Sequence, residues 1–195
     1  MGKGRLEAFS DGVIAIIITI MVLELRVPHG ADLAALRTVL PLFLTYVLSF
    51  VFLGIYWNNH HHLFQAVRHV EGRVLWANLH LLFWLSLIPF VTGWMGENFA
   101  PLPVALYGGV LLLAGAAYFV LTRALIACHG RDSTLARAIA NDSKEKMSVA
   151  GYLLAVIFAF VSPWISCAIY VAIALSWLVP DRRIERALAE SVKSA

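Results

Sequence analysis

The sequence predicts an all-α membrane protein with six transmembrane helices in a single domain, residues 1–195. Hydrophobic residues make up 61% of the chain and charged residues only 14%, whereas soluble domains average about 25% charged residues. Apolar runs of about 20 residues, the length that crosses a bilayer, recur along the chain with short polar connections between them. Composition and spacing together favour a helical membrane protein over a soluble one.

Four apolar segments each have the length of one span. They cover residues 9–25, 39–63, 74–94 and 104–127. The last apolar stretch, 147–180, would rise about 51 Å as one helix, which exceeds the roughly 30 Å of a hydrocarbon core. Ser162-Pro163 lies at its middle, and proline disfavours helix at the residue before it. We therefore predict two shorter spans there, at 147–161 and 163–179.

The basic residues predict the orientation of these spans. Of the 15 Lys and Arg residues, all except Arg26 and Arg37 lie at the termini or in the second and fourth connections. Cytoplasmic segments of membrane proteins carry such an excess. We therefore expect both termini to be cytoplasmic and the protein to lie in the cell membrane. Because topology accounts for the net charge of +3, we expect membrane lipid, and no nucleic acid, around the chain.

The first predicted span opens with polar residues although its remainder is apolar. Arg5, Ser10 and Asp11 lie at its cytoplasmic end. Ionisable groups within a span face protein or water rather than lipid and are functional candidates. The alternative is a helix cap or an ion pair that only fastens helices together.

An apolar stripe runs along the same predicted helix. Ile16, Ile20 and Leu23 share one face, because spacings of four and three residues return to the same side of a helix. Taken alone, such residues ordinarily face lipid or a protein core.

The residues of this first span also resemble those of a known family. The segment contains, in order, Arg5, Phe9, Ser10, Asp11, Ala15, Ile16 and Thr19. This pattern resembles the Arg-x-x-x-Phe-Ser-Asp signature of the lysosomal potassium channel family and its prokaryotic relatives. Animal members look like two six-span repeats in tandem, whereas the pattern occurs once here. The chain therefore resembles the single-repeat prokaryotic type, which implies a homotetramer.

The resemblance implies a potassium-permeable cation channel whose pore is lined by four copies of the first helix. It implies that Ile16 forms the narrowest point, that Ile20 and Leu23 follow on the same face, and that Thr19 contributes to cation preference. The sequence lacks the TVGYG loop whose carbonyls form the usual potassium filter. A pore lined by Ile and Leu offers an ion few ligands. We therefore expect gating by dewetting, moderate preference for potassium over sodium, and no cofactor besides the permeant potassium ion.

Polar residues of the first and third spans are expected to form one network under the pore helix. The resemblance implies that Arg5 and Asp11 bond to neighbouring helices, and Asn78 begins the third span at the same depth. Buried polar groups need partners. The residues of the predicted network are Arg5, Phe9, Ser10, Asp11, Asn78 and His80.

The remaining polar features do not predict a metal site. Residues 58–62 include three consecutive histidines, but adjacent residues do not share a helix face. We expect one of these histidines to face Arg5 or Asp11. Cys128 and Cys167 lie in no metal-binding spacing and are assigned no chemistry.

Two other functions remain open at this point. A proton-coupled secondary transporter would use the intramembrane Asp11 and His80, but no inverted repeat of the kind that transporters often have is recognisable. A membrane enzyme would need a nucleophile–base pair or a metal set, and we find neither. The sequence favours a channel that is not an enzyme.

Overall fold

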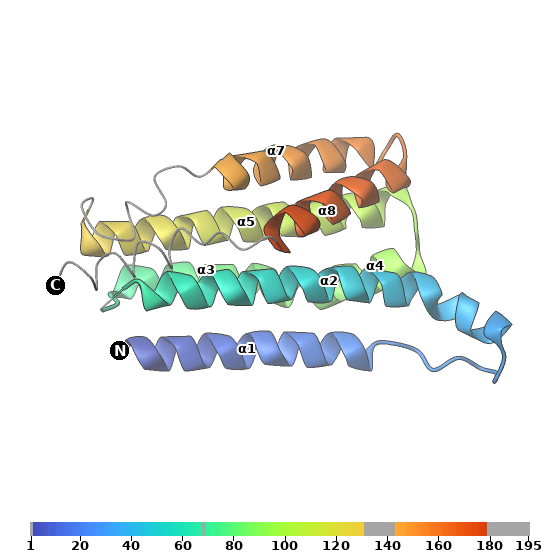
Figure 1. The fold of residues 1–195 in the computed structure, drawn as a ribbon, viewed down its shortest axis with the longest axis horizontal. Coiled ribbons are helices and arrows are strands. Elements are labelled where there is room, and N and C mark those ends of the chain that lie inside the picture. Colours follow the sequence, from blue (N-terminus) through green and yellow to red (C-terminus); the bar gives the residue numbers. More distant parts are fainter. Residues whose placement is uncertain (1, 68, 131–142, 179–195) are drawn as a thin grey trace.

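The computed structural model describes residues 2–67, 69–130 and 143–178, and all regular secondary structure in these ranges is helical. Figure 1 shows the helices lying lengthwise in one bundle. The helices are α1 (Lys3–Leu23), α2 (Leu33–Gln65), α3 (Gly72–Ser86), α4 (Ile88–Glu97), α5 (Pro101–His129), α7 (Ser143–Phe158) and α8 (Pro163–Leu178). The end of the sixth predicted span, at residue 179, lies outside the described residues.

Helices long and apolar enough to cross a membrane occupy the first four predicted segments. They are α1, α2, the pair α3 and α4 taken together, and α5, whereas α8 is apolar but shorter. Two helices also occupy the last apolar stretch, and Pro163 is the first residue of α8. The helix α2 begins before the predicted segment, because the Asp32 carboxylate caps it by accepting a hydrogen bond from the Ala35 backbone N–H at 2.8 Å.

The third predicted segment, residues 74–94, is divided between two helices, whereas the sequence analysis predicts one continuous span there. Leu87 separates α3 from α4, and Pro89 lies in the first turn of α4. Proline has no backbone N–H to continue the hydrogen-bonding of α3, and it restricts the residue before it. The backbone of Leu87 remains near helical values (φ −86°, ψ −11°), so α4 continues in nearly the same direction.

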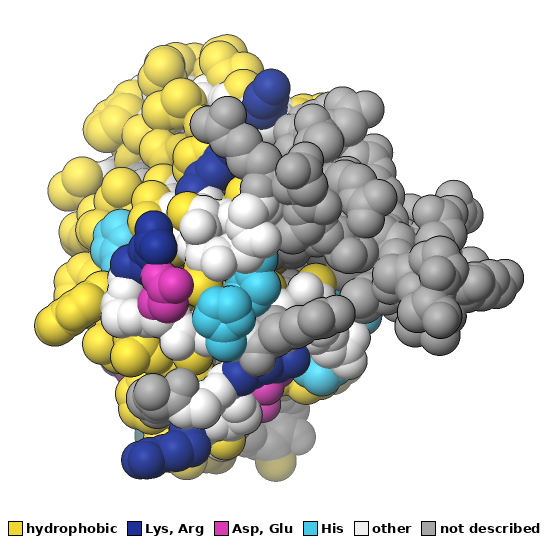
Figure 2. Space-filling model, turned by 90° about the vertical axis from the view of Figure 1, so that its left-hand side faces the viewer, with side chains coloured by type: hydrophobic (Ala, Val, Ile, Leu, Met, Phe, Trp, Pro, Cys, Tyr) yellow, Lys and Arg dark blue, Asp and Glu magenta, His cyan; other side chains and the backbone are white. Residues whose placement is uncertain are grey.

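The connections alternate between the two ends of the bundle. Figure 1 shows the start of α1, the end of α2 and the end of α5 at one end, and the α1–α2 and α7–α8 connections at the other. Figure 2 views the first of these ends, where Lys, Arg, His and acidic side chains gather, while hydrophobic side chains cover the flank.

A buried group of hydroxyls fastens α2, α4 and α5 together. The Ser49 hydroxyl lies 2.6 Å from that of Thr92 and 3.0 Å from that of Tyr107. All three side chains are buried, so each satisfies the others in an environment where an unpaired hydroxyl is costly. This group fastens α2 and α4, two of the helices that α1 contacts, to α5.

The helices α5 and α8 pack closely at Gly108. The Tyr170 hydroxyl donates a hydrogen bond to the Val104 carbonyl at 2.9 Å. A Cβ added at Gly108 would overlap that hydroxyl and lie 2.8 Å from Tyr170 Cζ. Only glycine leaves room for the tyrosine ring at this position.

The substitution Gly108→Ala should therefore lower stability. Overpacking of this kind costs about 1–3 kcal/mol, so we expect a lower midpoint of thermal denaturation in detergent. Gly109→Ala is the matched control, because a Cβ there meets nothing within 4 Å, and alanine is the better helix former. Equal midpoints for the two variants would contradict the close packing at Gly108.

Candidate functional site

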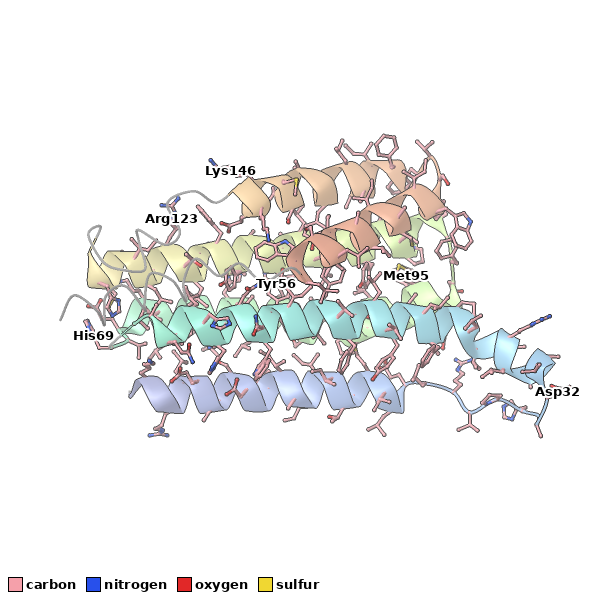
Figure 3. All side chains as sticks on the ribbon, viewed as in Figure 1. Asp32, Tyr56, His69, Met95, Arg123 and Lys146 are labelled. Carbon is pink, nitrogen blue, oxygen red and sulfur yellow. The ribbon has the colours of Figure 1, made fainter. Side chains whose placement is uncertain are left out.

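The helix α1 lies at the edge of the bundle and has one covered and one uncovered face. It contacts α2, α3 and α4, and its buried residues recur every three or four positions, so they form one stripe along the helix. These residues are Leu6, Ser10, Ile14, Ile17 and Met21. The side chains along the opposite side of α1 point away from the bundle (Figure 3).

The residues predicted to line a pore lie on the uncovered face. Ile16 is 59% exposed, Ile20 42% and Leu23 82%, whereas the neighbouring Ile17 is only 3% exposed. Successive residues are about 100° apart around a helix, so one position separates a covered isoleucine from an uncovered one. No other helix of the described chain covers this apolar stripe.

Thr19 is exposed on the same side of α1. Its hydroxyl donates a hydrogen bond to the Ile16 carbonyl at 2.8 Å. A hydroxyl oxygen also has two lone pairs, so this bond leaves the Thr19 oxygen able to accept from water or to contact a cation. The arrangement places one polar group within an otherwise apolar stripe.

Three buried side chains link the covered face of α1 to α2 and α3. His60 Nε2 lies 2.8 Å from Asn78 Oδ1, the Asn78 amide donates to the Ser10 hydroxyl at 2.9 Å, and that hydroxyl donates to the Leu6 carbonyl at 2.9 Å. Because a carbonyl oxygen only accepts, His60 Nε2 carries the proton in this contact. All three side chains are at most 1% exposed.

The network in the structure differs from the predicted one. Two predicted members, Ser10 and Asn78, belong to it, and its third member is His60, which was not predicted. Asp11 is exposed and accepts a hydrogen bond from the indole N–H of Trp57 at 3.0 Å. The reason is rotation: Ser10 points into the bundle, and Asp11 lies about 100° further around the helix.

The other predicted members lie outside this network as well. His80 is exposed and accepts a hydrogen bond from the Trp84 indole at 2.9 Å, one turn along α3. Arg5 and Phe9 are exposed on α1 and take no part in these contacts. Of the histidine cluster, the buried member His60 faces Asn78 rather than Arg5 or Asp11.

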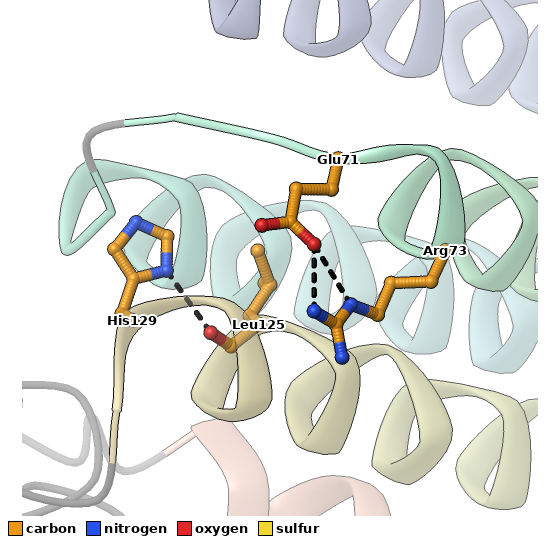
Figure 4. A network of polar contacts seen from close by, with 4 residues as sticks. All are labelled: Glu71, Arg73, Leu125 and His129. Atoms are coloured by element: carbon orange, nitrogen blue, oxygen red, sulfur yellow. Dashed lines mark hydrogen bonds and ion pairs between the residues drawn. The ribbon is translucent and has the colours of Figure 1, made fainter.

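A second polar group, at the end of the bundle shown in Figure 2, was not found by the sequence analysis. Ligand atoms of His69, Glu71 and Cys128 lie within 4.8 Å of one another. Arg73 donates two hydrogen bonds to one Glu71 oxygen (Figure 4). These bonds are the main reason why the pKa of Glu71 lies below its ordinary value, and a hydrogen bond with the Cys128 thiol lowers this pKa further. Since Cys128 is far from the other two in sequence, no local spacing predicts this group.

Comparison with known proteins assigns the family. Residues 5–89 match the family model described as "Endosomal/lysosomal potassium channel TMEM175", a range that includes every predicted site residue. A potassium channel of Chryseobacterium sp. is 55% identical over 192 residues, which cover 98% of this chain and 100% of that protein. The chain belongs to the TMEM175 family.

Other TMEM175 proteins resemble the chain in different ways. One solved structure is the crystal structure of a lysosomal potassium-selective channel TMEM175 homolog from Chamaesiphon minutus. It superposes on this chain with a TM-score of 0.76 at 29% sequence identity, and the match covers 92% of this chain and 97% of the homolog's chain. The endosomal/lysosomal proton channel TMEM175 of Gallus gallus is 42% identical over 101 residues, which are 46% of this chain but only 20% of the animal protein. The family assignment makes this chain a membrane protein, and it agrees with the resemblance found in the first span.

Proposed function

We propose that this chain forms a homotetrameric, potassium-permeable cation channel in the cell membrane. The observation that carries the proposal is the 55% identity to a bacterial potassium channel over the full length of that protein. Within this assembly the six segments named above cross the membrane and both termini are cytoplasmic.

Four copies of α1 surround the pore in this proposal. Its support is the uncovered face of α1, since one chain leaves Ile16, Ile20 and Leu23 exposed while it buries the opposite side. A single α1 cannot enclose a path for ions, whereas several copies arranged about an axis can. If the stripe faces the axis, Ile16, Ile20 and Leu23 line the pore instead of only contacting lipid.

The proposed constriction is a ring of four Ile16 side chains. Such an apolar ring loses its water readily, so it closes the pore without a moving plug. Thr19 lies one turn from Ile16 and offers hydroxyl oxygens near the ring. Four hydroxyls replace only part of a hydration shell, which favours potassium over sodium moderately because potassium is dehydrated more easily.

The buried network has a supporting role in the proposal. Asn78 bonds to Ser10 and is itself held by His60. These contacts fix the rotation of α1, and rotation decides which isoleucine faces the axis. Arg5 and Asp11, exposed in one chain, are assigned to contacts with neighbouring chains at the cytoplasmic end.

Proton permeation is the second candidate function. It is favoured by the animal relatives, which are named proton channels. The proton-coupled transporter that the sequence left open stays an alternative, and in it Asp11 and His80, which bond to Trp57 and Trp84, would act separately.

Reconstitution in liposomes tests both functions. With a potassium gradient and equal pH on both sides, a potassium channel should create a diffusion potential, measured with a voltage-sensitive dye, without a matching pH change. A pH gradient without a potassium gradient tests proton permeation in the same way. Obligatory exchange of potassium for protons would contradict a channel, and a monomer or dimer that conducts would contradict the fourfold pore.

A further inference from the structure

We propose that His69, Glu71 and Cys128 form a binding site for a divalent transition-metal ion of the zinc class. The site lies at the polar end of the bundle, between the α2–α3 connection and the last turn of α5. It is separate from the uncovered face of α1 and does not depend on the proposed channel function.

The donor atoms have the chemistry and nearly the spacing that zinc requires. Zinc is bound by imidazole nitrogen, thiolate sulfur and carboxylate oxygen, and donors at 2.0–2.3 Å from one ion lie about 3.3–3.8 Å apart. The three atoms here lie within 4.8 Å of one another, so they need to close by only about 1 Å. His69 and Glu71 are exposed, which lets an ion reach the site from water.

His129 lies beside the three donor residues, and its ring joins α5 to the α2–α3 connection. Its Nδ1–H donates to the Leu125 carbonyl at 3.0 Å, and Nε2 accepts from the His69 backbone N–H at 3.5 Å. The rings of His129 and His69 are 4.6 Å apart between centroids.

Arg73 orients the carboxylate ligand rather than blocking it. Both of its hydrogen bonds end on Glu71 Oε2, at 2.9 and 2.7 Å. The Cys128 thiol also hydrogen-bonds this carboxylate, and that bond is lost when the thiol gives up its proton to bind the ion. Ligating carboxylates are commonly held by a second partner such as Arg73. Figure 4 shows the carboxylate and the His129 ring on the two adjoining segments.

Binding requires one proton transfer and no redox change. The S–H bond of Cys128 breaks, the sulfur binds the ion as thiolate, and the proton passes to water. The bound ion then ties the α2–α3 connection to α5. That connection also accepts a hydrogen bond at the Val67 carbonyl from the Lys3 ammonium of α1 at 3.0 Å.

Cobalt spectroscopy on the purified full-length protein, prepared without a histidine tag, tests the site. We expect one Co²⁺ per chain, a thiolate-to-cobalt absorption band, and loss of that band when Zn²⁺ is added. Cys128→Ser should abolish the band, and His69→Ala should weaken binding at least about tenfold. Cys167→Ser is the matched control, because Cys167 is the other free cysteine and lies on α8; it should change neither.

A second measurement needs no variant and so remains informative if Cys128→Ser does not fold. Zn²⁺ should protect Cys128 from alkylation in the native protein, measured by mass spectrometry, and leave the labelling of Cys167 unchanged. A cobalt band that persists in Cys128→Ser or disappears in Cys167→Ser, or equal protection of both cysteines, would overturn the proposal.

Discussion

Replacing Ile16 with Asn should produce a channel that conducts at rest and discriminates poorly between potassium and sodium. The amide would hold water in the proposed ring, and each added hydrogen bond is worth about 1 kcal/mol. Because about 1.4 kcal/mol changes a rate tenfold, four amides in one ring should raise resting current by at least about tenfold. The measurement is current in planar bilayers under separate potassium and sodium gradients.

Two controls make this result specific to one face of α1. Ile16→Val keeps the ring apolar and should keep both low resting current and selectivity. Ile17→Asn places the same amide about 100° away, at a side chain that is only 3% exposed. It should reduce the yield of folded protein without opening a leak in the channels that do fold. Similar leaks from Ile16→Asn and Ile17→Asn would mean that another face of α1 lines the pore.

Asn78→Ala should have the largest effect on stability. It removes the acceptor of the His60 N–H and a donor to Ser10 in a site without water access. A buried polar group left unpaired, here the His60 N–H, costs about 1–3 kcal/mol, which is a substantial part of a typical folding free energy of about 5–15 kcal/mol. The Ser10 hydroxyl keeps its bond to the Leu6 carbonyl. We expect a strongly lowered thermal midpoint, and loss of intact assemblies in size-exclusion chromatography.

The exposed Asn58 on α2 supplies the matched control. Asn58→Ala removes the same amide from a surface position and should change the midpoint little. The double variant His60→Ala with Asn78→Ala should cost less than the sum of the single changes, because the two residues share one hydrogen bond. Strict additivity would show that they act only as separate core residues.

The sequence predicts the helices better than it predicts their rotation. Apolar length is sufficient to locate the first four helical segments, and Ser162-Pro163 separates α7 from α8. The length of the stretch 147–180 does not by itself require two helices, since α2 has 33 residues in one helix. Two local signals were available and unused: Asp32 as the cap of α2, and Pro89 as the cause of the break between α3 and α4.

The rotation of α1 about its own axis is harder to predict, because this helix is apolar on both sides. Its covered side contains Ile14 and Ile17 and its uncovered side Ile16 and Ile20, so hydrophobicity does not distinguish them, and only the family resemblance selects a face. The network was predicted in part for the same reason. Ser10 and Asn78 were included, but the choice between Asp11, His80 and His60 as partners depends on how three helices are turned against one another.

The packing of α1 has a consequence for how this architecture evolves. Within the part of the chain that the structure describes, one side of α1 is covered by α2, α3 and α4 of the same chain. Gene duplication followed by fusion would therefore yield a polypeptide whose two halves each fold as this chain does. The uncovered sides of the two first helices could then mutate independently, since neither contributes to the core of its own half. A pore built from such fused halves acquires two kinds of lining helix, and hence twofold rather than fourfold chemistry around the ion.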